Sequence, residues 1–253
     1  SDGNGGIVNK TINLNVDPII DITPGNDAPV FVESQEYIET LVNTETYDSQ
    51  SNSSISALND GGYVITWQSR SQDGSGFGVY SQRYSSIGEK VGVETLVNTN
   101  ALSEQSEPSV SSLSDGGYVI AWQSEGQDGS DLGIYSQRYS LIGEKVGSET
   151  LVNTSTAGSQ SIPTVSGLEE GGYVIAWKSS GQGGSGAGRY SQIYSSLGEK
   201  VGDEILVNSY SGIISTSALT DGGYVMTWQS GSDGSYSGIS SQRYSSTGET
   251  VGD

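Results

Sequence analysis

One pattern, written four times with a step of 55 residues, constrains the fold of this chain more than any other feature. The motif ETLVNT, or its variant EILVNS, recurs at that spacing, beginning at Glu39, Glu94, Glu149 and Glu204. The triplet GGY recurs with the same step and finally after 51 residues, beginning at Gly61, Gly116, Gly171 and Gly222. A constant period of this size predicts one supersecondary unit per repeat, each stacked on its neighbours.

Each repeat has the residue pattern of four short strands. In the first repeat we expect them at residues 54–58, 63–69, 78–84 and 93–99. Asp-Gly between β-rich runs indicates a tight hairpin, because glycine adopts the positive φ that such turns need. No useful length of the chain has helical periodicity. The sequence therefore predicts an all-β protein.

The second strand of each repeat carries apolar side chains on both of its faces. Tyr63, Ile65 and Trp67 point one way, while Val64 points the other. Both faces should therefore be covered, and a small sheet covered by copies of itself is a β-propeller blade. A solenoid of stacked hairpins is the alternative, although its repeats are usually shorter.

The two ends of the repeat region complement each other. Residues 39–44 have the sequence of a fourth strand with no first three strands before it, and the last repeat reaches Asp253 where its own fourth strand would begin. We expect residues 39–44 to complete the sheet of residues 213–244, which would close a four-bladed β-propeller over residues 31–253 and remove an exposed edge. A piece of a longer array of similar blades is the alternative.

Residues 1–30 lie outside the repeats. Residues 7–16 alternate apolar and polar side chains, which is typical of a half-buried strand. A lone strand is not stable. We therefore expect an extended N-terminal β arm and linker, which is either the last strand of a preceding domain or a donor to the sheet edge of a neighbouring copy.

The charge of the chain disfavours two classes of partner. Ten basic residues face thirty acidic ones, for a formal net charge of −20. Nucleic acid needs a basic surface, and anionic membranes attract one, so neither is expected as a partner. No stretch approaches the roughly 20 apolar residues of a membrane span, so membrane insertion is not expected. The acidity suits either solubility or divalent cations.

Catalysis has little support in the residue inventory. The chain contains no histidine and no cysteine, so Ser-His, Cys-His and His-metal schemes are excluded. Paired carboxylates hydrolyse glycosides, but here the acids sit in turns that repeat four times, whereas an active site normally breaks symmetry. We therefore expect that the protein is not an enzyme.

The loops between the second and third strands repeat acidic and amide oxygens on one rim. We expect ligand binding there by five residues: Gln72, Asp73, Gln127, Asp128 and Asp233. The third repeat has Gly183 in place of the aspartate. Simple turn formation by Asp-Gly-Ser is the alternative. The four tryptophans lie in mid-strand and are expected in the core rather than as sugar-stacking platforms.

Two stretches resemble parts of giant secreted bacterial adhesins. "TINLNVDPIIDITPGNDAPV" resembles the end of a cadherin-like or VCBS-type domain and its Asn-Asp-Ala-Pro junction, and "DGGYVIAWQSEGQDGSDLGIYSQRYS" resembles tandem repeats of RTX-type adhesins. The resemblance implies a secreted or cell-surface location. It also implies Ca²⁺ as a cofactor, with oxygen ligands from Asp17, Asp21, Asn26 and Asp27. The body of the preceding domain is missing, and a solvated linker is the alternative.

Together these observations predict an extracellular adhesion or ligand-binding module of a large bacterial surface protein. It would depend on calcium and would bind a glycan or a protein ligand. The alternative is a structural subunit or spacer of an extracellular fibre or surface layer. That alternative assembles by self-association, with residues 7–16 donated as a strand to the next subunit.

Overall fold

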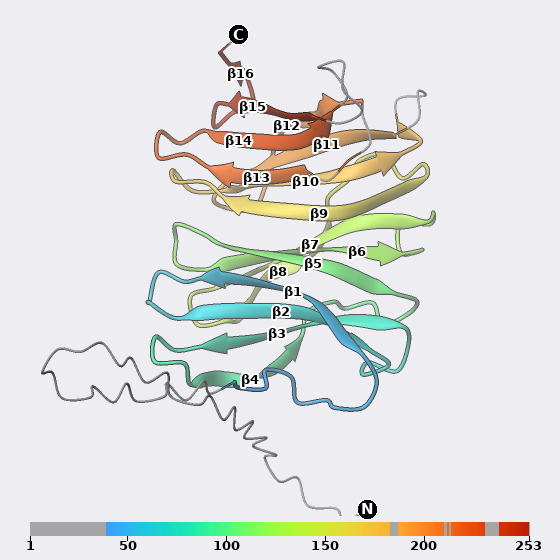
Figure 1. Cartoon of the computed structure of the whole chain (residues 1–253), viewed down its shortest axis with the longest axis vertical. Coiled ribbons are helices and arrows are strands. Elements are labelled where there is room, and N and C mark those ends of the chain that lie inside the picture. Colours follow the sequence, from blue (N-terminus) through green and yellow to red (C-terminus); the bar gives the residue numbers. More distant parts are fainter. Residues whose placement is uncertain (1–38, 183–186, 210–211, 213, 231–237, 253) are drawn as a thin grey trace, which may run out of the picture. The chain divides into compact units, whose positions relative to one another are not determined.

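Sixteen strands make up the described part of the chain, and they form four antiparallel sheets of four strands each (Figure 1). The computed structural model describes residues 39–182, 187–209, 212, 214–230 and 238–252. Residues 41–253 form one compact unit. The all-β prediction is confirmed, while the strand expected at residues 7–16 and the domain boundary expected after residue 30 lie outside the described residues.

Each repeat contributes one sheet, whose strands follow one another as hairpins. The first sheet contains β1 (Gln50–Ala57), β2 (Tyr63–Arg70), β3 (Phe77–Tyr84) and β4 (Lys90–Leu96). The second contains β5 (Gln105–Ser112), β6 (Tyr118–Glu125), β7 (Leu132–Tyr139) and β8 (Lys145–Leu151). The third contains β9 (Ser159–Gly167), β10 (Tyr173–Ser180), β11 (Ala187–Tyr194) and β12 (Lys200–Asn208). The fourth contains β13 (Ile214–Ala218), β14 (Tyr224–Ser230), β15 (Gly238–Tyr244) and β16 (Thr250–Val251).

The Asp-Gly-Gly turns form the hairpins that the sequence predicts. Gly61 has a φ of +82°, and the backbone N–H of Gly62 donates to the Oδ1 atom of Asp60 at 2.9 Å. A Cβ atom on Gly62 would lie 2.2 Å from the carbonyl oxygen of Tyr84. The first glycine is thus needed for its backbone conformation and the second for the close approach of the neighbouring chain.

A β-bulge divides the outer strand of each complete sheet into two halves. In the first sheet, Arg83 pairs with Val91 and Ser81 pairs with Thr95, with a register shift between them. At this register shift, the Nε2 atom of Gln82 donates a hydrogen bond to the carbonyl oxygen of Val91 at 3.2 Å. In the fourth sheet, β16 contains only the first half, because its two residues pair with Arg243 and Tyr244 alone.

The core lies between neighbouring sheets. One cluster joins Val64 and Val79 of the first sheet to Ile120 and Trp122 of the second, all of them fully buried. The tryptophans at positions 67, 122 and 177 are buried, and the one at 228 is partly buried, which confirms their predicted place in the core. Full burial of such an aromatic side chain stabilises the fold by about 3–5 kcal/mol relative to alanine.

The first strands of successive sheets lie against one another, so β1 contacts β5, β5 contacts β9 and β9 contacts β13. Small side chains permit this approach. The backbone N–H of Ser112 donates to the Oγ atom of Ser56 at 2.9 Å, and that of Gly167 donates to Ser111 Oγ at 2.9 Å. A Cβ atom on Gly167 would lie 2.1 Å from the carbonyl oxygen of Ser112.

Ring closure by residues 39–44 is not shown and stays a prediction. Those residues form no strand, and the first and fourth sheets lie at opposite ends of the row of sheets (Figure 1). Among the residues described, no helix has the length and apolar character needed to cross a membrane.

Candidate functional site

The glutamines predicted as ligands on the loop rim bond to glutamates of the same sheet. The Nε2 atom of Gln72 donates to Glu94 Oε1 at 2.6 Å, and that of Gln127 donates to Glu149 Oε1 at 2.6 Å. Gln182 makes the same contact with Glu204 in the third sheet, again at 2.6 Å. This bond joins the loop between the second and third strands to the outer strand, so it has a structural role in all three repeats.

The predicted aspartates shape the same loops. Asp73 Oδ1 accepts the backbone N–H of Ser75 at 3.3 Å, and Asp73 Oδ2 lies 3.5 Å from Asn98 Nδ2. Asp128 repeats both contacts at 3.1 and 3.4 Å. Burial, followed by the negative charges of Asp73 and Glu94, raises the pKa of Tyr80 to about 12. Ligand binding by these residues stays a prediction.

The remaining predicted site residues lie outside the described residues: Asp233 on the rim and Asp17, Asp21, Asn26 and Asp27 at the N-terminal junction. Within residues 39–182 and the later described segments, no group of three or more acidic side chains is placed to hold a metal ion. The rim as described therefore adds no support to the calcium prediction.

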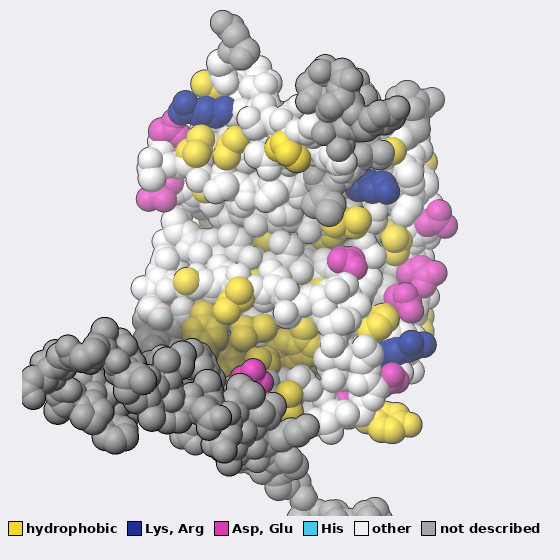
Figure 2. Space-filling view, viewed as in Figure 1, with side chains coloured by type: hydrophobic (Ala, Val, Ile, Leu, Met, Phe, Trp, Pro, Cys, Tyr) yellow, Lys and Arg dark blue, Asp and Glu magenta, His cyan; other side chains and the backbone are white. Residues whose placement is uncertain are grey.

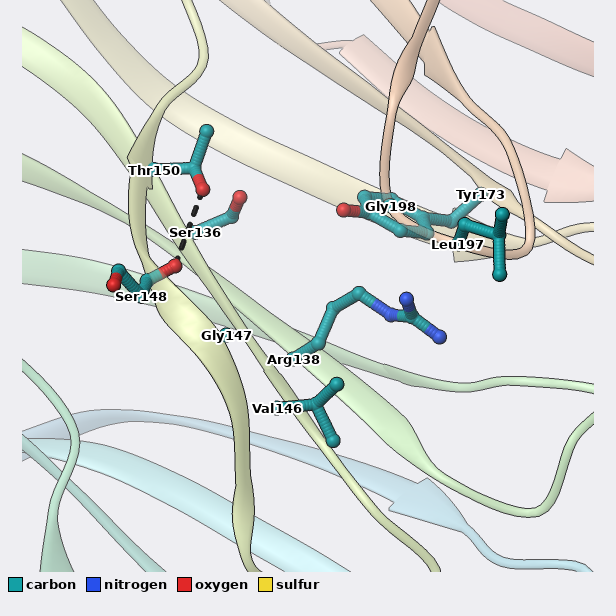
Figure 3. A pocket seen from close by; sticks show the side chains of 9 residues that line it. All are labelled: Ser136, Arg138, Val146, Gly147, Ser148, Thr150, Tyr173, Leu197 and Gly198. Carbon is teal, nitrogen blue, oxygen red and sulfur yellow. Dashed lines mark hydrogen bonds between the residues drawn. The ribbon is translucent and has the colours of Figure 1, made fainter.

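A cavity of about 160 Å³ opens between the second and third sheets, at a place the sequence analysis did not single out (Figure 3). We call the boundary between these two sheets the second interface. The lining residues come from β7, β8 and the third repeat: Ser136, Arg138, Val146, Gly147, Ser148, Thr150, Tyr173, Leu197 and Gly198.

The β-bulge of the second sheet shapes this cavity. The register of β7 and β8 shifts between Ser136 and Arg138, and Gln137 Nε2 fills the shift by donating to the carbonyl oxygens of Val146 at 3.2 Å and Gly147 at 3.3 Å. Ser136 and Arg138 point to the same side because side chains alternate along a strand. Strand β7 thus presents a hydroxyl and a guanidinium together at the second interface.

Arg138 is held from two sides. Its Nη2 atom donates to Asp115 Oδ2 at 3.1 Å, and its Cδ atom lies against Gly198 in the next repeat. Only 12% of its side chain is exposed. Its Nε atom is buried and has no hydrogen-bond partner among the described residues. A buried donor without an acceptor is costly. The Nε atom of Arg83 at the first interface is likewise buried without a partner among the described residues.

The other polar groups of the cavity are hydroxyls. Burial raises the pKa of Tyr173 to about 12, although Arg138 and a hydrogen bond with Ser136 act to lower it. Tyr173 is therefore a neutral hydroxyl near pH 7. Thr150 donates from Oγ1 to the carbonyl oxygen of Ser148 at 3.2 Å (Figure 3). The cavity combines one cationic donor with hydroxyls and contains no carboxylate in its lining.

The equivalent positions at the other boundaries differ. At the first interface, between the first and second sheets, Val93 replaces Ser148. At the third interface, between the third and fourth sheets, Ile193 replaces Arg138 and Ile205 replaces Thr150. Both isoleucines lie against Gly248, since a Cβ atom there would be 2.8 and 2.4 Å from their Cδ1 atoms. The repeat pattern therefore changes from a polar pair at the second interface to an apolar pair at the third.

Comparisons with known proteins identify a shared fold but no family. No model of a protein family matches the chain, and no curated protein matches it. Among solved structures, a Hadza microbial sialidase matches with a TM-score of 0.53 at 10% identity, over 79% of this chain and 45% of that one. The GH93 α-L-arabinofuranosidase of Fusarium graminearum matches with a TM-score of 0.50 at 13% identity, over 77% of this chain and 62% of that one.

A third structure, the endo-arabinase of Bacteroides thetaiotaomicron, matches with a TM-score of 0.49 at 16% identity, over 85% of this chain and 80% of that one. The first two matches place the four sheets in the β-propeller fold class, as the sequence predicted. The chain spans less than two thirds of either of those two structures.

The prediction that this protein is not an enzyme is wrong as an inference from its sequence. The four-fold repeat and the lack of histidine and cysteine gave catalysis little support, but structures with the same fold are a sialidase and an α-L-arabinofuranosidase. The fold is therefore one on which glycosidases are built. At 10% and 13% identity the likeness fixes the fold and assigns no reaction to this chain.

Proposed function

We propose that this chain is a carbohydrate-binding module of a large extracellular bacterial surface protein, with the sugar bound in the cavity of the second interface. The observation that carries the proposal is the cavity beside Arg138, whose buried Nε–H has no acceptor among the described residues. Arg138 lines a cavity whose other polar side chains are the hydroxyls of Ser136, Ser148, Thr150 and Tyr173.

This set of groups suits a neutral polyhydroxyl ligand. In this proposal a sugar hydroxyl accepts from the guanidinium of Arg138 and donates to Ser136 or Tyr173, so each side completes hydrogen bonds of the other. The cavity is smaller than the roughly 300–1,000 Å³ of pockets for drug-sized ligands, which favours one sugar ring or the end of a chain. Figure 2 shows Lys, Arg, Asp and Glu side chains mostly toward the edges of the face that it draws.

The interfaces of the chain supply a matched experiment. The double variant R138I/T150I gives the second interface the isoleucine pair of the third, so the chain itself shows that the pair is compatible with the fold. A glycan array in calcium buffer identifies the ligand, and calorimetry then measures its Kd. Loss of a charged hydrogen bond weakens binding by about tenfold or more.

Arg83→Ile at the first interface is the control, because Arg83 makes the same ion pair with Asp60, at 3.1 Å, as Arg138 makes with Asp115. We expect its affinity to stay within about twofold of the wild type. An array without binding, or equal losses in both variants, would remove the second interface from the account. The mixtures of protein and glycan are also analysed for shorter sugars, which would indicate hydrolysis, because solved structures with this fold include glycosidases.

The adhesive role, the cell-surface location and calcium rest on the resemblance to adhesin repeats and belong to the same proposal. Calcium would be held by Asp17, Asp21, Asn26 and Asp27, all outside the described residues. The melting temperature in excess calcium should exceed that in chelator. An identical melting temperature in the two buffers would take the metal out of the proposal.

A structural subunit of a fibre or surface layer remains the second proposal. It uses residues 7–16 as a donated strand, so removing residues 1–30 would abolish assembly but leave glycan binding intact. The closed four-bladed ring is the finer fold prediction. It requires Leu41 to reach β15 of its own chain, although the two belong to opposite ends of the row of sheets (Figure 1).

A further inference from the structure

Residues 41–44 are held by the first sheet as if they ended a preceding blade. Lys90 Nζ donates to the carbonyl oxygen of Val42 at 2.7 Å, and the backbone N–H of Thr44 donates to Glu94 Oε2 at 2.7 Å. One repeat later, Lys145 and Glu149 make the same bonds, at the same distances, to Val97 and Thr99. Asn43 also repeats the bond of Asn98, since both side chains donate to a glutamine at the start of the next sheet.

On its other side, this segment has no strand partner among the described residues. In the first sheet, the backbone N–H of Val97 donates to the carbonyl oxygen of Val79 at 2.8 Å, and the N–H of Val79 donates to Asn98 Oδ1 at 2.8 Å. Val79 and Val97 are both fully buried by this pairing. Leu41, by contrast, is 63% exposed, and Val42 is only half-buried.

In the fourth sheet, part of strand β15 lacks a partner strand among the described residues. In β15, Arg243 and Tyr244 pair with β16, whereas no described strand pairs with Ser240 or Ser241 on that side. Their counterparts Tyr80 and Ser81 pair with Leu96 and Thr95. Ile239 is 80% exposed, although its counterparts Val79 and Ile134 are fully buried.

Residues 41–43 and the unpaired part of β15 have the sequence and register of two strands that pair in the first sheet. We propose that Leu41–Asn43 of one copy supplies the missing half-strand to β15 of a second copy, head to tail. By analogy with the first sheet, Leu41 pairs with Ser240, Val42 N–H donates to the carbonyl oxygen of Ile239, and Ile239 N–H donates to Asn43 Oδ1. The contact buries Ile239 and Leu41 and satisfies an open sheet edge, which otherwise attracts other strands.

A second copy is the occupant because the two surfaces lie at opposite ends of the row of sheets (Figure 1). Such a contact joins different patches of two identical chains, so it generates a ring of copies or a filament. The donor segment differs from residues 7–16, and the contact is independent of the proposed sugar site.

The absence of cysteine from the chain makes cross-linking specific. Two single variants, Leu41→Cys and Ser240→Cys, are mixed and oxidised, and we expect a disulfide-linked dimer that neither variant forms alone. Ile142→Cys, at a position that is 69% exposed in a turn of the second repeat, replaces L41C as the control for random collisions. The double variant S136C/T150C, at paired positions of β7 and β8, is the positive control for oxidation.

The double variant L41C/S240C separates assembly from ring closure. Cross-linking within a monomer at low protein concentration would overturn the head-to-tail contact, as would the absence of a mixed dimer when the positive control is oxidised.

Light scattering gives an independent readout. The wild-type mass should rise above that of a monomer with concentration, and Leu41→Asp or Ile239→Asp should abolish the rise, while Ile142→Asp should not. A monomeric wild-type protein at all concentrations would also overturn it.

Discussion

Arg138 packs its aliphatic stem against Gly198 across the second interface, and a Cβ atom on Gly198 would lie 3.0 Å from Arg138 Cδ. Arg83 and Gly143 make the same contact at the first interface, at 2.9 Å. The third strand of one sheet is thus fitted to the turn of the next repeat. At the second interface the same contact also fixes one wall of the candidate sugar site.

This contact predicts the effect of Gly198→Ala. The new methyl group meets Arg138, and the φ of +82° strains any residue with a side chain. We expect a loss of about 1–3 kcal/mol in the free energy of unfolding, measured by urea denaturation. Gly147→Ala is the control, because its φ is +69° but nothing lies within 4 Å of the new Cβ atom. Equal losses in the two variants would show that the packing contributes nothing.

Truncation of the tryptophans should follow their burial. Trp177 is fully buried, and its ring lies 6.4 Å from that of Tyr190, centroid to centroid. Trp177→Ala should therefore cost about 3–5 kcal/mol. Trp228 is only partly buried at the end of the row of sheets, so Trp228→Ala should cost clearly less. Denaturation curves in which the two variants lose the same stability would contradict this ranking.

Stability should fall steeply in alkali. Burial raises the pKa of Tyr118 and Tyr173 from 10.0 to about 12. Above pH 10 the unfolded chain releases these protons while the folded chain retains them, so the free energy of unfolding decreases between about pH 10 and pH 12. Each such tyrosine contributes a slope of up to about 1.4 kcal/mol per pH unit. Tyr118→Phe should reduce the slope, and an unchanged slope would be inconsistent with its burial.

Substitution of Gln127 distinguishes ligand binding at the loop rim from ligand binding in the cavity. Its bond to Glu149, at 2.6 Å, joins the loop to the outer strand, so Gln127→Ala should lower the free energy of unfolding by about 1–2 kcal/mol. We expect the glycan affinity to stay within about twofold. A large loss of affinity with unchanged stability would instead support Gln127 as a ligand-binding residue.

The sequence predicts the parts of this fold that depend on local pattern. The Asp-Gly-Gly turns, the alternating faces of residues 63–69 and the buried tryptophans all follow from residue type and spacing. The second interface does not, because its cavity depends on a bulge between Ser136 and Arg138 and on Gly198 of the next repeat. The isoleucines at 193 and 205 are a visible signal, because one repeat later they replace Arg138 and Thr150, which line the cavity.

The most direct measurement of the central claim follows the Nε–H signals of the arginines by nuclear magnetic resonance during titration with the sugar selected by the array. Arg138→Ile and Arg83→Ile assign the two signals. We predict a saturable shift of the Arg138 signal, while the Arg83 signal stays in place. A sugar that binds without moving Arg138, and instead shifts the backbone signals of Gln72 and Asp73, would contradict the account and return the site to the loop rim.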